Sequence, residues 1–389
     1  MNTHPPAGAR KRVVISIFDD VDNPHYAGGG AVVIEKVARR LSEEFDVTVV
    51  TAGSRGTRIR RGVRYHYLPI GWAGPRGGQL LFHAMLPLLA RRMPHDLWME
   101  SFTPPFSTSF LPLFSRAPVV GIDQAACGEA MWRKYHIPFF LIEDVGFRCY
   151  RDLVVLNAAA RAAAGRHGAT AVHVIPNGIE AGPVDRARLG EGEHILFLGR
   201  IDTNLKGLDL LLEAYTRAAV PMPLLLAGAG TRSEERKLAA LLRRAGPGVR
   251  WLGHVDGAEK QRLLARSAFM VMPSRHEAFG ITALEAMAHG KPVLHFDLPS
   301  LRWLGGSGNV SVPPFDVDAL ADRMREVASD RQAREHLAGL AHEAVRRFSW
   351  DETTGRYLAL ARDLLRPAPT AEPDAATSEQ GEASWVPTR

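Results

Sequence analysis

Short runs of β-branched and aliphatic residues alternate along the chain with longer segments in which apolar positions recur every three or four residues. Six apolar runs in the first half predict strands at residues 12–18, 47–51, 96–99, 118–122, 153–156 and 171–175. Segments 31–45 and 157–167 have the spacing of amphipathic helices. Alternating strands and helices are typical of parallel α/β sheets. We therefore predict a parallel sheet in the first half of the chain.

The pattern starts again after Pro176-Asn177-Gly178, which is a turn signal. Five further runs predict strands at residues 194–198, 222–227, 249–252, 269–272 and 292–295. The length of 389 residues also exceeds what one hydrophobic core usually fills. We predict an α/β protein with two Rossmann-like, doubly wound domains, residues 1–180 and 181–349, that face a cleft. Ligands are expected at the carboxyl ends of the strands.

The segment that follows the second domain has two parts. Residues 350–366 have the pattern of an amphipathic helix, which ends just before Pro367. Residues 367–389 are rich in Ala, Pro, Glu, Ser and Thr. Such a composition cannot bury enough apolar surface to fold, so we predict a disordered tail.

The composition, with 46% hydrophobic and 23% charged residues, is that of a soluble globular enzyme. The longest apolar run, residues 80–90, is too short to cross a bilayer. No cleavable leader is recognised at the N-terminus, so we expect a cytoplasmic protein. Cys127 and Cys149 have neither metal-ligand spacing nor a disulfide framework, which suits a reducing compartment.

The net charge of +6 lies entirely in the first half, because residues 181–389 hold equal numbers of acidic and basic side chains. A basic N-terminal domain suits an acidic acceptor or a peripheral contact with an anionic membrane surface. A solvated basic surface is the simpler interpretation. Nucleic acid is not an expected partner, because no nucleic-acid-binding motif accompanies the charge. Arginine outnumbers lysine by 41 to 7, a usage typical of GC-rich bacterial genomes.

Segment 273–293 carries the most specific chemistry. It is predicted to pass from a strand end through a loop into a helix that begins near Phe279. Backbone N–H groups at a helix start form an anion site. The groups concerned belong to Ala278, Phe279, Gly280 and Ile281. Glu277 precedes this site, and Glu285 lies in the helix about 9–12 Å away, a spacing that suits hydroxyls on opposite sides of a diphosphate.

Two other segments point to the same chemistry. Arg200 and Lys206 lie between the strand 194–198 and the next helix, where the helix dipole disfavours cations. A bound anion would resolve this conflict, since arginine offers phosphate a planar fork and lysine a mobile charge. A glycine run between the first strand and its helix permits a close backbone approach to a ligand, although its spacing is not that of a dinucleotide fingerprint. The run consists of Gly28, Gly29 and Gly30.

Together these segments resemble glycosyltransferase family 4 over nearly the whole chain. The most specific match is the E-x7-E pair of Glu277 and Glu285 within P-S-x-x-E-x-F-G-x-x-x-x-E-A-M-A, and the Gly-Arg and Lys-Gly pairs of 199–207 add support. The resemblance implies the GT-B fold, with a last helix that crosses back onto the N-terminal domain. It also implies retaining transfer, without metal or cofactor, of a hexose-type sugar from a nucleoside-diphosphate sugar, most often UDP-linked, to an acceptor hydroxyl.

The resemblance also implies roles for single residues. Glu277 would hold hydroxyls of the donor sugar, and Glu285 those of the ribose. Arg200 and Lys206 would hold the diphosphate, together with the amides of 278–281 and the glycine run. Glu277, Arg200 and Lys206 are thereby catalytic candidates as well as donor-binding ones.

The sequence departs from the family after the predicted strand 118–122, where members usually carry a histidine and this chain has Asp123. Asp123 could take over the sugar contact and stabilise positive charge at the anomeric carbon, or it could cap the next segment. Glu100, His25 and Tyr26 are candidate acceptor contacts. The acceptor itself is open between a cell-envelope glycan or lipid and a specialised metabolite.

Other functions share this scaffold. An epimerase, a hydrolase or a phosphorolytic enzyme is one alternative, and a degenerate GT-B protein that binds without transfer is another. The intact Glu277, Glu285, Arg200 and Lys206 argue against degeneracy. No metal site is expected, because the histidines of the C-terminal half lack metal-ligand spacing.

Overall fold

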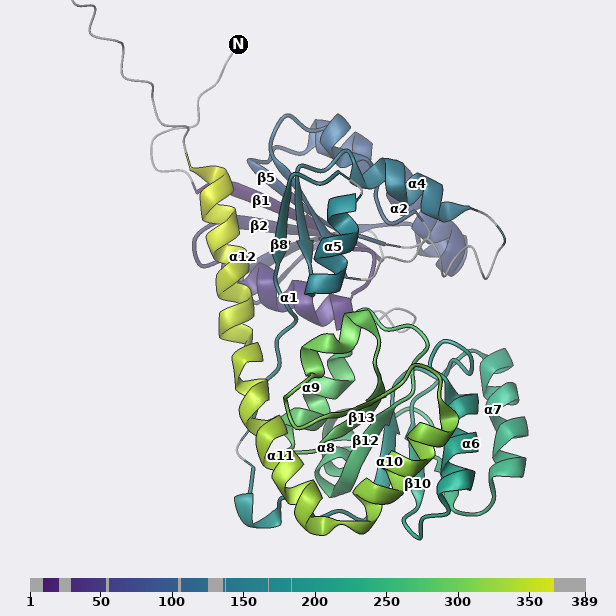
Figure 1. Ribbon diagram of the computed structural model, residues 1–389. Coiled ribbons are helices and arrows are strands. Elements are labelled where there is room, and N and C mark those ends of the chain that lie inside the picture. Colours follow the sequence, from purple (N-terminus) through teal and green to yellow (C-terminus); the bar gives the residue numbers. More distant parts are fainter. Residues whose placement is uncertain are drawn as a thin grey trace, which may run out of the picture.

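In the computed structural model, two α/β domains lie one above the other, and the last helix of the chain runs alongside the N-terminal domain (Figure 1). The structure describes residues 10–20, 29–53, 56–103, 106–124, 136, 138–166, 168–182 and 184–366. The tail 367–389, expected to be disordered, lies outside these ranges.

The N-terminal domain is built on an eight-stranded sheet with the order β3-β4-β2-β1-β5-β6-β7-β8. Every pairing is parallel except that of β3 with β4, which form an antiparallel hairpin. The strands are β1 (Arg12–Ser16), β2 (Asp46–Ala52), β3 (Gly56–Arg60), β4 (Val63–Leu68), β5 (Leu97–Ser101), β6 (Val119–Asp123), β7 (Asp152–Val155) and β8 (Ala171–Val174). Central strands such as β1, β5 and β7 are covered on both faces, which is why each contains an uninterrupted run of three apolar residues.

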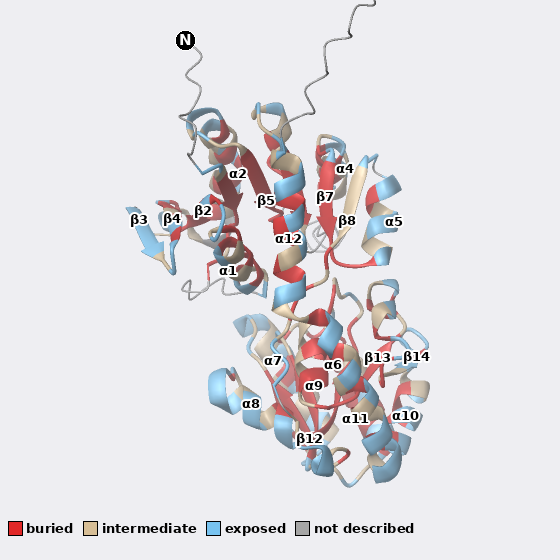
Figure 2. Cartoon of the chain, turned by 90° about the vertical axis from the view of Figure 1, so that its left-hand side faces the viewer, coloured by how far each residue is buried: buried red, intermediate tan, exposed pale blue. Residues whose placement is uncertain are grey.

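Helices cover both faces of this sheet. They are α1 (Gly29–Leu41), α2 (Gly74–Arg92), α4 (Phe139–Phe147), α5 (Ala158–Arg166), α12 (Trp350–Leu365) and the short η1 (Gly71–Ala73) and η2 (Leu111–Leu113). One face packs against α1 and α12 through residues such as Val37 and Tyr357. The other packs against α2, α4 and α5, with Phe82 and Phe147 in the core. Figure 2 shows the resulting layers, with buried strands inside and exposed helix faces outside.

The C-terminal domain contains a six-stranded, fully parallel sheet with the order β11-β10-β9-β12-β13-β14. Its strands are β9 (His194–Leu198), β10 (Leu224–Ala227), β11 (Val249–Trp251), β12 (Ser267–Met272), β13 (Val293–Phe296) and β14 (Val310–Val312). Its helices are α6 (Leu208–Ala218), α7 (Arg232–Ala245), α8 (Gly257–Arg266), α9 (Ile281–Ala288), α10 (Val317–Ser329), α11 (Arg331–Val345), η3 (Arg186–Arg188), η4 (Pro299–Leu304) and η5 (Arg346–Phe348).

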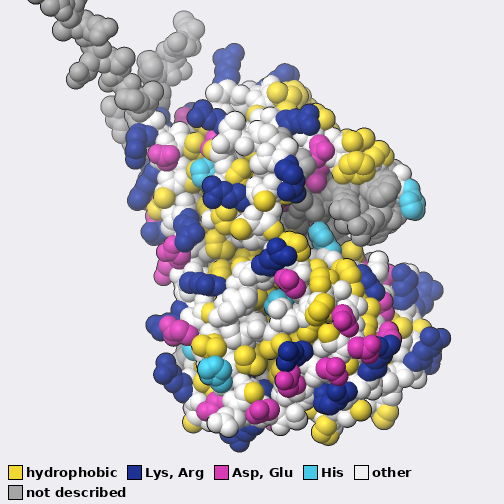
Figure 3. Space-filling model, in the orientation of Figure 1, with side chains coloured by type: hydrophobic (Ala, Val, Ile, Leu, Met, Phe, Trp, Pro, Cys, Tyr) yellow, Lys and Arg dark blue, Asp and Glu magenta, His cyan; other side chains and the backbone are white. Residues whose placement is uncertain are grey.

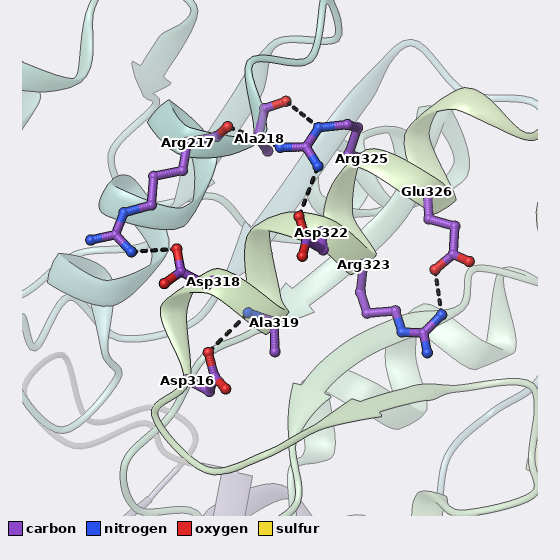
Figure 4. A network of polar contacts seen from close by, with 9 residues as sticks. All are labelled: Arg217, Ala218, Asp316, Asp318, Ala319, Asp322, Arg323, Arg325 and Glu326. Atoms are coloured by element: carbon purple, nitrogen blue, oxygen red, sulfur yellow. Dashed lines mark hydrogen bonds and ion pairs between the residues drawn. The ribbon is translucent and has the colours of Figure 1, made fainter.

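Helix α10 is attached to the carboxyl end of α6 (Figure 4). Arg325 donates hydrogen bonds to the carbonyls of Arg217 and Ala218, at 3.1 and 3.2 Å, which lie in the unsatisfied last turn of α6. Asp316 caps the start of α10 by accepting a hydrogen bond from the N–H of Ala319 at 2.9 Å. These contacts fix α10 over the edge of the sheet without using the residues of the predicted site.

Two connections between the domains run side by side. The N–H of Ile179, on the way into the C-terminal domain, donates to the carbonyl of Phe348, on the way out, at 2.7 Å. Gly178 lies so close to Trp350 that an added Cβ would be 2.7 Å from the indole ring. Beyond this point α12 packs along α1 and joins the N-terminal core. The last helix thus crosses back onto the N-terminal domain, as the family resemblance implies.

Some elements were not expected from the sequence. Residues 55–64 and 71–79 carry no recognised motif, but the structure places the β3–β4 hairpin and the start of α2 there. Strand β3 is an edge strand exposed on both faces, with Ile59 78% exposed, so it lacks the apolar pattern that marks a strand. Strand β14 is only three residues long. Helix α9 begins two residues later than predicted, after Gly280.

The surface charge differs between the domains. On the face drawn in Figure 3, acidic side chains gather over the C-terminal domain, whereas basic side chains are spread over both domains. In the ranges listed above, no helix has the length and apolar content that a bilayer span requires.

Candidate functional site

The loops with the predicted donor residues meet where the strand order of the C-terminal sheet reverses. Strand β9 lies between β10 and β12, so the chain leaves β9 in one direction and β12 in the other. Residues 199–207 follow β9, and residues 273–280 follow β12. Open parallel sheets bind ligands at such a switch point, outside the carboxyl ends of the strands. The structure therefore brings the two predicted segments together at a place suited to a ligand.

The two loops are held against each other. The N–H of Arg275 donates to the carbonyl of Leu205 at 2.9 Å, and its guanidinium forms two contacts of 2.7 Å with the Asp209 carboxylate. Gly207 has a φ of +63°, and a Cβ added to it would lie 1.9 Å from the carbonyl oxygen of Pro273. Only glycine permits this approach, so Gly207 sets the spacing between the loops.

A group of backbone N–H donors lies at the start of α9. Among the described residues, the N–H groups of residues 277–280 have no protein oxygen as acceptor. Gly280 leads into the helix with a left-handed backbone, φ +84° and ψ 56°, and the first amides of α9 face the same loop. Free amides at the positive end of a helix form an anion site.

Glu277 and Lys206 form an ion pair that joins the two loops. Lys206 Nζ lies 2.5 Å from Glu277 Oε2, and the two side chains are only 21% and 15% exposed. The Ser274 hydroxyl also donates to Glu277, at 3.3 Å. The negative charge expected near Lys206 is thus supplied by the protein itself. A bound anion would compete with Glu277 for Lys206 rather than meet an unpaired cation.

The remaining charges of the predicted set differ in their contacts. Glu285 accepts a hydrogen bond at 2.8 Å from Lys260 of α8. Lys260 is outside the predicted set, because the α8 sequence shows only an amphipathic pattern. Arg200 is exposed, and its guanidinium makes no hydrogen bond or ion pair with the part of the chain that the structure describes. Arg200 is therefore open to an incoming anion.

The N-terminal domain contributes the start of α1 to the same place. A Cβ added to Gly29 would lie 2.6 Å from Cδ1 of Ile281, so the first residues of α1 and α9 touch. Gly30 is the second residue of α1. Both helix N-termini carry partial positive charge, and together they favour an anion near their junction. The other predicted residues of this loop lie outside the described ranges: His25, Tyr26 and Gly28.

Glu100 is placed differently from the expectation. It lies near the end of β5 but is only 1% exposed, and it accepts hydrogen bonds from the Tyr150 hydroxyl and, at 2.7 Å, from the N–H of Ser109. Burial raises its pKa to about 7, although these hydrogen bonds act in the opposite direction. The acceptor contact proposed from the sequence is therefore replaced by a structural role, because neighbouring segments close over the strand end.

Two aspartates lie at the carboxyl edge of the N-terminal sheet. Asp123 is the last residue of β6 and is half-buried beside Val155 of β7. Asp19 follows β1, and burial raises its pKa to about 6. Carboxylates with a raised pKa are frequent at functional sites. The sequence around Asp19 does not predict that its side chain is buried. Both sugar contact and capping stay open for Asp123.

Two residues outside the predicted set contact the loop that carries the free amides. Asn157, in the N-terminal domain, donates from Nδ2 to the carbonyl of Ala278 at 2.8 Å. Trp303, in η4, donates from Nε1 to the carbonyl of Phe279 at 2.9 Å and stacks on its ring with a centroid distance of 4.7 Å. These contacts join distant parts of the sequence, so no local sequence motif predicts them.

A surface groove of about 620 Å³ beside α10 is a weaker candidate. Its charged side chains already form ion pairs, Arg323 with Glu326 and Arg325 with Asp322 (Figure 4). None of the predicted donor residues lines it. The loops after β9 and β12 are therefore the better candidate site.

Two family models match the chain. The model described as Glycosyltransferase Family 4 matches residues 27–182, and the model described as Glycosyl transferases group 1 matches residues 192–330. A phosphatidyl-myo-inositol mannosyltransferase of Mycolicibacterium smegmatis is 33% identical over 195 residues, which cover 47% of this chain and 50% of that protein. A glycogen synthase of Mycobacterium tuberculosis is 33% identical over 216 residues, or 52% of each. The chain thus spans about half the length of the curated relatives it matches.

Solved structures match over a longer span. Sucrose-phosphate synthase from Thermosynechococcus elongatus has a TM-score of 0.77 at 20% identity and covers 91% of this chain and 99% of its own. HepE of Anabaena, solved in complex with UDP and glucose, has a TM-score of 0.69 at 18% identity and covers 91% of this chain and 100% of its own. With this fold and both family models, the chain is a two-domain GT-B protein that belongs to glycosyltransferase family 4.

Proposed function

We propose that this protein is a retaining glycosyltransferase that moves a hexose-type sugar from a nucleoside-diphosphate sugar to an acceptor hydroxyl. The observation that carries the proposal is the group of N–H groups at residues 277–280 that have no acceptor among the described residues, in a loop that the Lys206–Glu277 ion pair joins to the loop of Arg200. A diphosphate has several acceptor oxygens and more than one negative charge. Amide donors and cations that meet at one helix start suit it. The two family models support a transferase.

The two glutamates have separate roles in this proposal. Glu285 accepts hydrogen bonds from the ribose hydroxyls. Glu277 gives up Lys206 when the diphosphate arrives and accepts from hydroxyls of the donor sugar instead. Before the donor binds, the Lys206–Glu277 ion pair holds the two loops together. After the donor binds, Lys206 contacts the diphosphate and Glu277 contacts the sugar. UDP is the proposed nucleotide, which is supported by the UDP and glucose bound to HepE, a protein of the same fold.

The reaction needs no protein nucleophile. The bond between the anomeric carbon and the phosphate oxygen breaks, and charge grows on the departing diphosphate. Arg200, Lys206 and the free amides stabilise that charge where it develops, so no metal ion is required. The acceptor hydroxyl approaches the face that the phosphate leaves. Its oxygen bonds to the anomeric carbon, its proton passes to the phosphate, and the configuration is retained.

The acceptor belongs, in this proposal, to bacterial cell-envelope or specialised-metabolite biosynthesis on the cytoplasmic side. One relative is named for mannosyl transfer to phosphatidyl-myo-inositol, which is a lipid. The exposed face of α2 suits a lipid surface. Leu80, Ala84 and Leu88 recur along one side of the helix, and Arg91 and Arg92 end it. Apolar residues beside arginines are typical of helices that lie on anionic membranes.

Vesicle binding tests the membrane contact. Trp72, which precedes α2, is 82% exposed, and Leu88 is 52% exposed. We expect cosedimentation with vesicles that contain an anionic phospholipid at low salt, and its loss in a Trp72→Ala/Leu88→Ser variant. Leu340→Ser is the matched control, because Leu340 is a 43% exposed leucine of the C-terminal domain. Equal binding of all three proteins, or binding by none, would rule out a contact through α2.

Thermal unfolding against a panel of nucleoside diphosphates and nucleotide sugars tests the activity at its donor site. A ligand at 100 times its Kd stabilises the native state by about 2.7 kcal/mol. We expect this for one nucleotide family in the native protein and in the surface control Glu326→Gln, but not in Glu285→Gln. Product analysis by NMR should then show the anomeric configuration of the donor. Binding without transfer or donor hydrolysis would indicate a degenerate member, and no stabilisation by any nucleotide would refute the donor site.

A further inference from the structure

Residues 277–280, here called the amide loop, contain two consecutive backbone carbonyls that accept hydrogen bonds from side chains elsewhere in the chain. The carbonyl of Ala278 accepts from Asn157 Nδ2 at 2.8 Å, and the carbonyl of Phe279 accepts from Trp303 Nε1 at 2.9 Å. A trans peptide unit has its C=O and its following N–H on opposite sides. Fixing these two carbonyls therefore fixes the directions of the N–H groups of Phe279 and Gly280. Both N–H groups belong to the set that has no acceptor among the described residues.

Asn157 is itself rigidly held in the other domain. Its Oδ1 accepts from the N–H of Ala160 at 2.9 Å and so caps α5, while its Nδ2 also reaches the carbonyl of Ser300 at 3.3 Å. The side chain is 6% exposed. Serine or aspartate would cap α5 equally well, but neither offers an N–H for the opposite domain. The side-chain NH2 group of Asn157 is therefore the group that connects the two domains here.

Trp303 links the same loop to the crossing point of the two connections. Its ring stacks on Phe279 and meets Phe348 edge-on at 4.9 Å. The carbonyl of Phe348 is the one that accepts from Ile179, where the chain enters the C-terminal domain. Asn157 thus connects the amide loop to the N-terminal domain, and Trp303 connects it to the crossing point of the two connections.

We propose that Asn157 and Trp303 form a carbonyl clamp, a pair of positioning residues that aims the N–H groups of Phe279 and Gly280 at the donor phosphate. Hydrogen bonds to the carbonyl side of a peptide unit also polarise its N–H, which strengthens the bond to an anion. Asn157 completes the clamp only when the N-terminal domain is in place. Donor phosphate affinity is then coupled to contact between the domains. This inference rests on the proposed donor-binding function.

The test compares a nucleoside diphosphate with its nucleoside, UDP and uridine if the proposed donor is right. Asn157→Ser keeps the helix cap but removes the donor group, and Trp303→Phe keeps the stacking but removes the N–H. Each should weaken UDP binding about tenfold, the equivalent of one hydrogen bond, and leave uridine binding unchanged. Asn157→Asp should weaken UDP binding further, because its carboxylate faces two carbonyls. Isothermal titration calorimetry gives the UDP affinity, and ligand-observed NMR gives that of uridine.

Thr353→Val is the control, since Thr353 bonds the Pro176 carbonyl at 3.1 Å between the domains without touching the amide loop. It should bind UDP like the native protein. Equal loss of UDP and uridine in the clamp variants would mean general damage to the site and overturn the clamp. Native UDP affinity in Asn157→Ser and Trp303→Phe would overturn it while the donor site stands. A native protein that binds no nucleoside diphosphate would end both proposals. If Asn157→Ser does not fold, Trp303→Phe decides.

Discussion

Gly207→Ala is expected to push apart the two loops that hold Lys206 and Glu277. The added Cβ would lie 1.9 Å from the Pro273 carbonyl oxygen, whereas real Cβ atoms essentially never come within 3.0 Å. One loop must therefore move by about 1 Å, and a misplacement of that size costs about 100-fold in rate. This loss corresponds to about 2.7 kcal/mol of transition-state stabilisation. Lys206 and Glu277, 2.5 Å apart, cannot keep their geometry through such a shift.

A backbone effect must be separated from this collision. Gly207 has a left-handed φ of +63°, which costs an alanine about 1–2 kcal/mol whatever the available space. Gly62 is a matched control, because it has a φ of +82° in the two-residue turn between β3 and β4, where both residues have positive φ, and an added Cβ would have nothing within 4 Å. Gly62→Ala should therefore have the backbone cost alone, and the difference between the two variants isolates the contact between the loops.

Urea unfolding and donor turnover distinguish the two effects. Both variants should unfold at a lower urea concentration than the native protein, and Gly207→Ala at the lower of the two. Only Gly207→Ala should lose nucleotide affinity and about 100-fold in kcat/KM. If Gly207→Ala behaves like Gly62→Ala in both assays, Gly207 does not set the loop spacing and the reasoning fails.

Three further predictions concern pH, metal and Lys260. Because burial raises the Glu100 pKa from 4.5 to about 7, the folded state keeps a proton that the unfolded state releases. The free energy of unfolding should therefore fall by about 3 kcal/mol as pH rises from 4.5 to above 7. Glu100→Gln should flatten this slope in urea titrations, and an unchanged slope would contradict the assignment. Transferase activity should survive dialysis against EDTA, whereas a loss restored by Mg²⁺ or Mn²⁺ would show a metal requirement. Lys260→Met should reduce nucleotide affinity less than Glu285→Gln, since Lys260 acts through Glu285; a larger loss in calorimetry would show that Lys260 itself contacts the ligand.

The sequence predicts features that depend on local order. Core strands are continuous apolar runs, and Arg200, Lys206 and Glu277 stand at fixed positions relative to strand ends, so their meeting follows from a parallel sheet with a switch point. Contacts between distant segments are different. Lys260 is 25 positions from Glu285, and Asn157 is 121 positions from its acceptor on Ala278. Such pairs depend on strand order and on how the domains meet, which no spacing encodes.

Glu100 illustrates a further limit. Its place at the carboxyl end of a strand correctly puts it at the ligand edge of the sheet, but whether that end is open depends on what covers it. Ser109 and Tyr150 come from segments that the strand pattern does not describe. How deeply a side chain is buried therefore depends on the tertiary structure, even where its position along a strand can be predicted from the sequence.

The crossing of α12 reverses the order in which the domains can be completed during synthesis. Tyr357, Leu358 and Ala361 are buried in the N-terminal core, although nearly the whole C-terminal domain precedes them in the chain. While the ribosome works through β9 to α11, the surface of α1 that α12 will cover has no partner. The second domain emerges with all of its strands before the first has its last helix. A nascent chain that stalls after α11 would therefore hold a complete C-terminal sheet and an N-terminal domain with an open apolar face.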